Sequence, residues 1–238
     1  MSLDRVRALT FDVFGTVVDW RTSIAREAEA ALAPKGHALD WPGFADAWRA
    51  RYQPAMQAVR TGARPFTKLD VLHRENLDLV LADFGVSGLE DAELDHLNRA
   101  WHRLDPWPDV LAGLARLKGK YVLATQSNGN VALMVNMAKR AGLPWDVILG
   151  AEVCQAYKPM PEAYLRAADL LGLAPEECMM TAAHNDDLKA AAAQGFRTAF
   201  VPRPTEYGPG QTKDLKADPS VDIAADSFIA LADKLGCP

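Results

Sequence analysis

The sequence predicts an α/β fold, a Rossmann-like parallel-sheet core with an inserted all-helical cap. Short strand-like apolar runs alternate with helical periodicity after residue 106, whereas the block between residues 20 and 101 has helical periodicity alone. Strands that alternate with helices favour a parallel sheet covered on both faces. The chain has 238 residues, of which 49% are hydrophobic, so it can bury the core that such a sheet requires.

The first strand is expected at Val6 to Phe14, a run rich in strand formers that meets a turn at Gly15-Thr16. Helix-spaced apolar residues then run from Trp20 to about Trp101. Because ligands of open α/β sheets bind at the carboxyl ends of the strands, we expect this helical block to cover that edge. The predicted domains are a core of residues 1–19 and 106–238 and a helical cap of residues 20–105.

The other elements of the core follow from the same alternation. Strands are predicted at residues 121–125, 147–149, 178–182 and 198–201, and helices at residues 110–117, 135–141, 161–171 and 187–194. Residues 202–220 are rich in Pro, Gly, Asp and Lys, which predicts a surface loop. Residues 227–235 are expected to form a short terminal helix or to dock as an apolar strip.

Charge and cysteine content narrow the classes of partner and the location. The formal net charge of −5 argues against a nucleic-acid partner. Cys154, Cys178 and Cys237 lack the spacing of a disulfide framework or a zinc site, which favours a reducing compartment. The sequence has no long apolar segment typical of a signal peptide or a membrane span, so we expect a cytoplasmic protein without a membrane partner.

Four groups of polar residues directly follow predicted strands. They are Asp12 with Thr16, Ser127 with Asn128, Lys158, and the run His184-Asn185-Asp186-Asp187. Since the carboxyl ends of parallel strands share one edge, these groups are expected to meet in one cleft. Each group alone is typical of a turn or a solvated loop, but their order and placement together predict a site.

In this order the residues resemble the haloacid dehalogenase superfamily. The run Phe11-Asp12-Val13-Phe14-Gly15-Thr16 is similar to its first motif, Ser127-Asn128 to its second and Lys158 to its third, and Asp187 lies in its fourth. The resemblance covers nearly the whole chain. It implies that Asp12, at the end of the first strand, is the nucleophile.

Two positions distinguish this chain from the magnesium-dependent phosphatases of that superfamily. Those enzymes carry a general-acid aspartate where this chain has Phe14, and a metal-binding aspartate where it has Ala183. A phenyl ring has no proton to give to an alkoxide leaving group. Asp12 and Asp187 alone supply too few oxygen ligands for a tight Mg²⁺ site. Asp186 could add a third, so a magnesium site is not excluded.

The chain therefore resembles the L-2-haloacid dehalogenases, whose halide leaving group needs no proton and whose aspartate works without a metal or other cofactor. The implied roles are Asp12 as nucleophile with Thr16 beside it, Arg49 as halide acceptor on the cap, Ser127 and Asn128 as ligands of the substrate carboxylate, Lys158 as charge partner of Asp12, Tyr164 as a further substrate-binding residue, and Asp187 as a catalytic residue. The fourth motif departs from the Ser-Ser-Asn-x-x-Asp of the best-known members, because this chain has Ala182-Ala183-His184-Asn185-Asp186-Asp187.

The residue types suit this chemistry. A neighbouring lysine ammonium lowers the pKa of a carboxylate and keeps it ionised for attack. A cationic donor stabilises a departing halide more in the transition state than in the ground state. Arg49 is the first candidate for this donor, ahead of Arg51, Arg60 and Arg64.

A water molecule must then cleave the ester on Asp12. Asp187, directly or through Lys158, is the first candidate for orienting and deprotonating that water. His184 stays open between a role at this water site and a structural role. The other histidines, His37, His73, His96 and His102, are expected on solvated helix faces or at element boundaries.

We therefore expect hydrolytic dehalogenation of short 2-haloalkanoic acids to 2-hydroxy acids by a homodimer, with a small-molecule haloacid as its substrate. A magnesium-dependent phosphatase of the same superfamily and a non-catalytic binding protein are the alternatives. The intact set of Asp12, Ser127, Lys158 and Asp187 argues against the latter. The sequence leaves the preferred halide open.

Overall fold

The centre of the molecule is a parallel sheet with the strand order β5-β4-β1-β6-β7-β8. The computed structural model describes residues 3–238, so the first two residues of the predicted core segment 1–19 lie outside the described residues. The strands are β1 (Ala8–Phe11), β4 (Val122–Ser127), β5 (Val147–Gly150), β6 (Cys178–Ala182), β7 (Arg197–Phe200) and β8 (Ile223–Ala224). The α/β fold class predicted from the sequence is confirmed.

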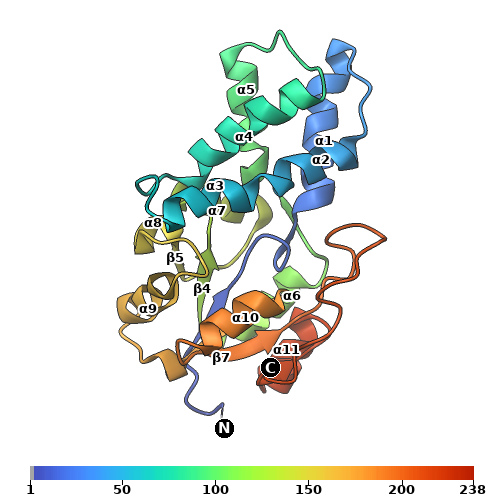
Figure 1. Ribbon diagram of the computed structural model, residues 1–238. Coiled ribbons are helices and arrows are strands. Elements are labelled where there is room, and N and C mark those ends of the chain that lie inside the picture. The colour runs from blue at the N-terminus through green and yellow to red at the C-terminus, as the bar shows by residue number, and fades with distance from the viewer. Residues whose placement is uncertain (1–2) are drawn as a thin grey trace.

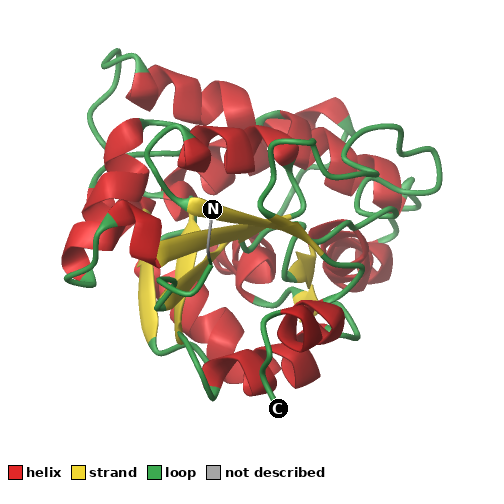
Figure 2. Cartoon of the chain, turned by 90° about the horizontal axis from the view of Figure 1, so that it is seen from below, coloured by secondary structure: helices red, strands yellow, loops and turns green. Residues whose placement is uncertain are grey.

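Helices cover both faces of this sheet, as Figure 2 shows from below. The apolar cluster on one face includes α6 (Val110–Lys118), α7 (Val131–Ala141) and α11 (Phe228–Lys234), and the cluster on the other face includes α9 (Pro161–Leu170) and α10 (Asn185–Ala192). The short α8 (Ala151–Cys154) follows β5. The central strand β1 serves both faces, because Leu9 and Phe11 belong to the first cluster and Ala8 to the second.

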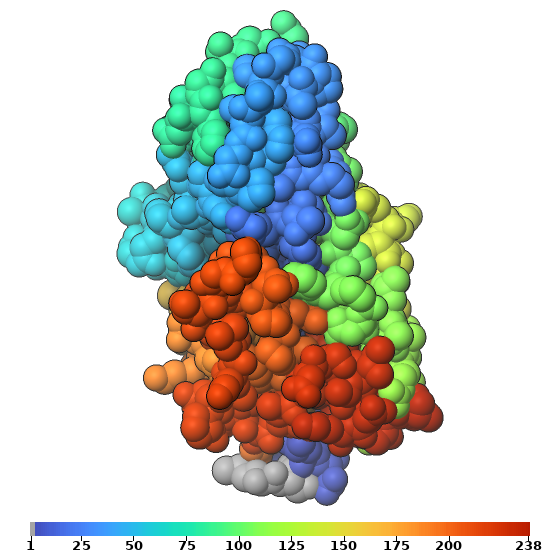
Figure 3. All heavy atoms as spheres, turned by 90° about the vertical axis from the view of Figure 1, so that its right-hand side faces the viewer, coloured from blue at the N-terminus to red at the C-terminus, as the bar shows by residue number. Residues whose placement is uncertain are grey.

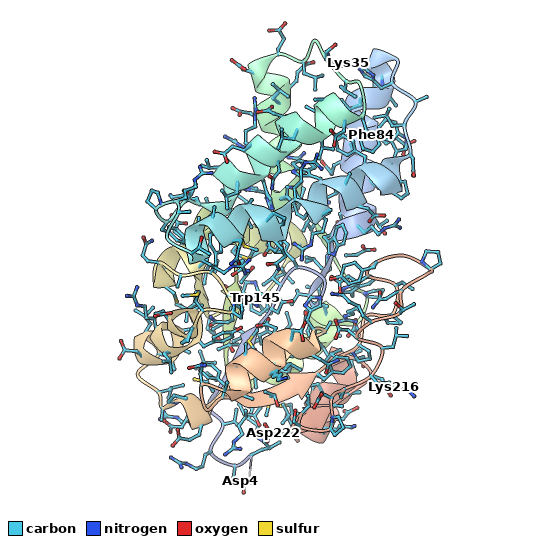
Figure 4. All side chains as sticks on the ribbon, in the orientation of Figure 1. Asp4, Lys35, Phe84, Trp145, Lys216 and Asp222 are labelled. Atoms are coloured by element: carbon cyan, nitrogen blue, oxygen red, sulfur yellow. The ribbon has the colours of Figure 1, made fainter. Side chains whose placement is uncertain are left out.

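Five helices between residues 20 and 102 lie above the carboxyl edge of the sheet (Figure 1). These cap helices are α1 (Trp20–Leu32), α2 (Trp41–Ala50), α3 (Tyr52–Arg60), α4 (Leu69–Asp83) and α5 (Asp91–Asn98), with 3₁₀ turns at Ala33–Lys35 and Arg99–His102. Lys35 and Phe84 mark this upper region in Figure 4, and Asp222 lies at the opposite end of the molecule. Among residues 3–238, no helix has both the length and the apolar character needed to cross a membrane.

A two-stranded ribbon lies where the chain enters and leaves the cap helices. β2 (Val18–Asp19) pairs antiparallel with β3 (Asp105–Pro106). Asp19 also caps α1, because its side chain accepts a hydrogen bond of 3.0 Å from the backbone N–H of Thr22. Such a cap satisfies one of the free N–H groups of the first helical turn, which explains why the helical block begins at Trp20.

The segment of residues 202–220 differs from the expected surface loop. Arg203 and Glu206 are buried, and the ring of Tyr207 packs 6.0 Å from that of Trp20. In Figure 3 the orange atoms of this loop lie directly against the blue atoms of the first cap helix. The short strand β8 that follows was not predicted either, since its two residues carry too little pattern to be recognised.

Two of the histidines that were expected on solvated helix faces or at element boundaries are buried: His73 lies within α4, and His102 ends the 3₁₀ turn Arg99–His102. His73 stacks on Trp101 with the ring centroids 4.4 Å apart. His102 lies between Asp70, whose Oδ1 is 3.0 Å from Nε2, and Asn136, whose Nδ2 is 3.0 Å from Nδ1. Aromatic stacking and a polar network that joins α4 to α7 make burial of these imidazoles favourable, and neither effect is visible in local periodicity.

Candidate active site

The polar groups that follow the strands meet at the carboxyl edge, as the sequence predicts. Asp12 follows β1, Asn128 follows β4, and His184 follows β6 as the N-cap residue of α10. The prediction that Lys158 directly follows a strand is wrong, because α8 separates it from β5 and it lies in the segment between α8 and α9. Its backbone N–H donates a 2.8 Å hydrogen bond to Oδ1 of Asn128. This bond fixes the lysine against the end of the neighbouring strand, so that its side chain reaches Asp12.

One oxygen of Asp12 is held by a buried chain of charges. Lys158 Nζ lies 2.9 Å from Asp12 Oδ1 and also forms an ion pair with Asp187 Oδ2. The hydroxyl of Tyr164 donates a 2.7 Å hydrogen bond to the other oxygen of Asp187. The lysine therefore bridges two carboxylates, and the tyrosine fixes the outer one.

The second oxygen of Asp12 receives two further groups. Thr16 Oγ1 donates a 2.7 Å hydrogen bond to Asp12 Oδ2 and itself accepts the backbone N–H of Ala183 at 2.8 Å. His184 Nδ1 lies 3.1 Å from the same Oδ2, and its Nε2 lies 2.8 Å from Oε2 of Glu206. Glu206, which was not predicted from the sequence, extends the line from Asp12 through His184 into the loop after β7.

Glu206 is fixed from two more directions. Its Oε1 accepts a 3.0 Å hydrogen bond from Nε1 of Trp20, the first residue of α1. Gly15 lies so close that a Cβ at this position would be 2.0 Å from the same Oε1, and its φ is +89°. Only a glycine satisfies both the left-handed turn and the space that the carboxylate occupies.

The electrostatics follow from this packing. Burial opposes ionisation of Asp12, but Lys158 and His184 reverse this effect and hold the pKa of Asp12 well below its usual range. Burial and the charge of Asp12 raise the pKa of Asp187, against the opposing effect of Lys158. Burial also disfavours the charged form of His184, yet Glu206 and Asp12 raise its pKa to about 10.

A cavity of about 700 Å³ opens beside these residues. Its lining includes Asp12, Phe14, Arg49, Tyr52, Gln53, Gln57, Arg60, Asn128, Lys158, Tyr164, His184, Asp186, Asp187, Tyr207 and Lys213. Both the cap helices and the core contribute to this wall. A cavity on which several polar groups with shifted pKa values converge has the properties of a reaction site.

On the cavity wall, Arg49 lies against three aromatic rings. Its guanidinium carbon lies 4.0 Å from the ring centroid of Tyr52, 5.3 Å from that of Trp20 and 5.8 Å from that of Phe14. Its Nη1 is buried and has no hydrogen-bond partner among residues 3–238. A buried unpaired N–H is costly, so this donor is suited to an anion that enters the cavity.

The structure brings most of the predicted site residues to the cavity wall but places two behind it. Thr16 does not line the cavity and acts on it through Asp12. Ser127 is buried at the end of β4, where its Oγ accepts a 3.1 Å hydrogen bond from the backbone N–H of Gly129, and it does not line the cavity either. The weaker candidate Arg60 lines the cavity, and its Nη1 donates to the backbone oxygen of Lys158 at 2.8 Å.

Glu206 and Tyr52 are the site residues that sequence reasoning missed. Tyr52 belongs to a helical face and reads as an ordinary apolar residue. A signal for Glu206 was present, because the loop after β7 leaves the same carboxyl edge of the sheet as the other site groups. The same rule that identified Asp12 therefore also applies to that loop.

The donor set does not fit a bound divalent metal ion. Lys158 occupies one oxygen of Asp12, and Thr16 and His184 occupy the other. Within the part of the chain that the structure describes, no group of three or more His, Cys, Asp or Glu side chains could hold a metal ion. A metal at Asp12 would have to displace a buried ammonium from its carboxylate.

Comparisons with known proteins agree with this geometry. Residues 6–195 match the family of haloacid dehalogenase-like hydrolases. The chain is 31% identical over 216 residues to (S)-2-haloacid dehalogenase 1 of Pseudomonas sp. (strain CBS-3), covering 86% of this chain and 89% of that protein.

Two solved structures are more similar still. A defluorinating L-2-haloacid dehalogenase is 52% identical, with a TM-score of 0.96 over 98% of this chain and 96% of that one. A second L-2-haloacid dehalogenase is 48% identical, with a TM-score of 0.94 over 97% of this chain and 99% of that one. The chain therefore belongs to the haloacid dehalogenase-like hydrolases, within their L-2-haloacid dehalogenase branch.

Proposed function

We propose that this protein hydrolyses short 2-haloalkanoic acids to 2-hydroxy acids and halide through an ester on Asp12, without a metal or other cofactor. One observation carries the proposal. An ionised buried carboxylate paired with Lys158 shares a cavity with Arg49, whose Nη1 is buried and lacks a hydrogen-bond partner among the described residues. A nucleophile and an acceptor for a departing anion are the two groups that this displacement needs.

In the first step Asp12 attacks C2 of the haloacid from the side opposite the halogen. The carbon–oxygen bond forms as the carbon–halogen bond breaks, the bonding pair leaves with the halide, and the configuration at C2 inverts. The lowered pKa keeps Asp12 ionised at neutral pH without a separate base. Arg49 gains a partner as negative charge develops on the halide, and the rings of Tyr52 and Phe14 exclude water around it.

The substrate carboxylate needs donors at a distance from Asp12, since the two anions repel each other. Asn128 lines the cavity, where its Oδ1 accepts from the backbone of Lys158 and its side chain also forms a hydrogen bond with the hydroxyl of Tyr52. Its amide is therefore a donor that an incoming carboxylate would share with Tyr52. We assign the substrate carboxylate to Asn128, with Ser127 behind it as the residue that shapes this turn through its bond to Gly129.

In the second step water attacks the ester carbonyl carbon of Asp12. Asp187 lies next to Asp12 across Lys158, and its pKa is raised by burial, which makes it the better proton acceptor of the pair. Tyr164 orients the Asp187 carboxylate through its 2.7 Å hydrogen bond. We therefore assign the role of general base to Asp187.

The phosphatase alternative is not supported. Phe14 lies where a general acid is needed, and its ring packs edge-on against Trp101 at 5.8 Å and Tyr52 at 6.3 Å. An alkoxide leaving group would receive no proton from this position, whereas a halide requires none.

We also propose that residues 20–105 act as a cap domain over a core of residues 1–19 and 106–238. The β2–β3 ribbon supports these boundaries, because Asp19 pairs with Asp105 where the chain crosses between the two parts. A homodimer and a cytoplasmic location stay predictions. Light scattering on the purified protein and fractionation of the source cells test them, and three free buried cysteines fit the reducing conditions of a cytoplasm.

A halide-release assay tests the proposed reaction. The wild-type protein and Asp12→Asn are incubated with chloroacetate, fluoroacetate and both enantiomers of 2-chloropropionate, with EDTA present throughout. We expect halide release from the wild type with the (S) enantiomer, no release from Asp12→Asn, and a 2-hydroxy acid of inverted configuration. Loss of all activity with EDTA, or phosphate release that depends on Mg²⁺, would overturn the proposal.

A further inference from the structure

We propose that the ion pair of Glu206 with His184 holds a cationic donor against Oδ2 of Asp12, and that His184 and Thr16 together form the oxyanion hole for hydrolysis of the aspartyl ester. This inference rests on the proposed function and deepens it. It assigns a role in the second step to His184, which lies where the fourth motif of this chain differs from that of the best-known members. Glu206 is then a positioning residue for His184.

The geometry requires a doubly protonated imidazole. Nδ1 of His184 lies 3.1 Å from a carboxylate oxygen of Asp12, and Nε2 lies 2.8 Å from a carboxylate oxygen of Glu206. A neutral imidazole would direct a lone pair at one of these two anions. With a proton on each nitrogen, both contacts become charge-assisted hydrogen bonds.

The two oxygens of Asp12 accept different numbers of hydrogen bonds, and this difference assigns their roles in the reaction. Oδ2 accepts two hydrogen bonds, from Thr16 at 2.7 Å and from His184, whereas Oδ1 accepts one from Lys158 at 2.9 Å. Thr16 takes the backbone N–H of Ala183 on its lone pair, so its own proton points to Oδ2. We therefore assign Oδ1 as the attacking atom and Oδ2 as the carbonyl oxygen of the ester.

The hydrolysis step then balances as follows. Water bonds to Cγ of Asp12, one of its protons passes to the Asp187 carboxylate, and the carbonyl electron pair moves onto Oδ2. When the tetrahedral intermediate collapses, the Cγ–Oδ1 bond breaks and the proton on Asp187 passes to Oδ1, which leaves as the hydroxyl oxygen of the product. The second water proton goes to solvent, and Asp12 regains its carboxylate. In the neutral ester, full negative charge returns to Oδ2 only as the tetrahedral intermediate forms, so donors fixed there stabilise that intermediate relative to the ester.

Glu206 is needed because alkylation removes the other anion beside His184. In the free enzyme Asp12 and Glu206 both raise the pKa of His184 against the effect of burial. Once Asp12 is an ester it carries no charge, and Glu206 is the remaining carboxylate in contact with the imidazolium. Its side chain is 1% exposed and fixed by Trp20, so its negative charge is screened little by solvent.

Other charged groups lie near this pair and are held constant in the experiment. Those that line the same cavity are Arg49, Arg60, Lys158, Asp186, Asp187, Lys213 and Asp214, with the titratable tyrosines Tyr52, Tyr164 and Tyr207. The side chain of Tyr207 also forms a hydrogen bond with Glu206. Only Asp12 and Glu206 form an ion pair with His184 within residues 3–238. Replacement of Glu206 therefore changes the nearest charge to His184 and leaves the nucleophile and its lysine in place.

The first experiment separates the two chemical steps. Wild type, Glu206→Gln, His184→Asn and the control Glu75→Gln, which alters a cap residue paired with Arg64, are mixed with (S)-2-chloropropionate at pH 8 and quenched for intact-mass measurement. We expect ester hydrolysis to slow by on the order of 10²-fold in the two site variants, with the Asp12 adduct accumulating. The burst of halide release persists, and kcat and KM fall together.

The pH dependence of single-turnover hydrolysis distinguishes an oxyanion donor from a general base. Without Glu206 the pKa of His184 falls toward its ordinary value of 6.5, so the imidazole loses its proton between pH 6 and 8. We expect the Glu206→Gln rate to approach the wild-type rate at pH 6 and to fall as the pH rises. If His184 were the base, the same variant would become faster over this range.

Three outcomes would overturn the inference. The first is faster ester hydrolysis in Glu206→Gln than in the wild type at pH 8. The second is an equal loss of halide release and of ester hydrolysis in a folded variant that accumulates no adduct. The third is ester hydrolysis in His184→Asn at the wild-type rate. Circular dichroism and the melting temperature of each variant establish that it is folded. Absence of halide release and of any adduct in the wild type would instead overturn the proposed function, so the two failures are distinguishable.

Discussion

Lys158 and Arg49 both line the cavity, but the protein surrounds them in opposite ways. The side chain of Lys158 is 8% exposed and lies between the carboxylates of Asp12 and Asp187. Arg49 lies against three aromatic rings and has a buried Nη1 without a hydrogen-bond partner among the described residues. The charge of Lys158 is already neutralised in the resting protein, whereas that of Arg49 is available to an incoming anion. The difference teaches that equal charges at one site can serve the nucleophile and the leaving group separately.

Removal of the paired cation should have the largest effect. Lys158→Met leaves two buried carboxylates side by side, so we expect activity to fall by about 10³-fold or more and stability to fall by about 3–5 kcal/mol. Halide release and urea unfolding measure the two losses. The control Lys68→Met removes an exposed lysine paired with Glu152 and should change neither appreciably. If Lys158→Met kept the wild-type stability, the ion pairs of Lys158 would not stabilise the fold, and the contrast with Arg49 would be wrong.

Removal of the unpaired cation should affect catalysis alone. Arg49→Gln takes away the halide donor but leaves no carboxylate unpaired, so we expect kcat to fall by about 10²–10³-fold with unfolding free energy little changed. The loss should be greater for chloro than for bromo substrates, because the poorer leaving group depends more on this donor. Arg51→Gln, which alters an arginine paired with Asp83 away from the cavity, is the matched control. A fall in stability as large as that of Lys158→Met would contradict the contrast between the two cations.

The outer end of the Lys158 chain should matter less. Tyr164→Phe removes one 2.7 Å hydrogen bond to Asp187, and a bond to a charged group corresponds to about tenfold in rate. We expect this loss in ester hydrolysis and not in the halide burst, as measured by rapid-quench kinetics. An equal loss in both phases would mean that Tyr164 acts on Asp12 through Lys158 and not on Asp187 alone.

Two buried histidines differ in the same way, since His184 has carboxylate partners and His73 has no hydrogen-bond partner among the described residues. Burial lowers the pKa of His73 to about 3, while Glu206 and Asp12 overcome burial and raise the pKa of His184 to about 10. Below pH 6.5 His73 binds a proton in the unfolded chain but not in the native state. The free energy of unfolding therefore falls as the pH drops. The native state keeps a proton on His184 that the unfolded chain releases above pH 6.5, so stability falls as the pH rises toward 10.

Stability should therefore be greatest near pH 6.5 within the range from 5.5 to 8.5. Each limb has a slope of at most about 1.4 kcal/mol per pH unit, and urea unfolding across the range measures it. His73→Phe should flatten the acid limb, and His184→Asn should flatten the basic limb. If either variant keeps both limbs, the assigned charge of that imidazole is wrong.

Much of the fold and of the site could be predicted because the relevant signals are local. β6 spans the predicted residues 178–182, since buried β-rich runs are legible in the chain itself. Asp12 was found because polar residues at strand ends are brought together by the topology of a parallel sheet. Lys158 was expected directly after a strand, but α8 separates it from β5.

The parts that sequence analysis missed depend on contacts that have no local pattern. Glu206 lies in a segment rich in Pro and Gly, and its burial comes from His184 and Trp20, both distant in the sequence. His73 is buried by a stack on Trp101. Tertiary partners override local polarity in each of these residues, so only the assembled fold reveals them.

Because Gly15 lies so close to Glu206, the residue types that fit at these two distant positions depend on each other. Asparagine often replaces glycine in left-handed turns, but here its side chain would enter the space of the carboxylate. Such a replacement becomes tolerable only in a lineage that has already shortened residue 206. A side chain in the turn beside the nucleophile is therefore compatible only with a shorter residue 206, which would leave the histidine opposite without its acidic neighbour.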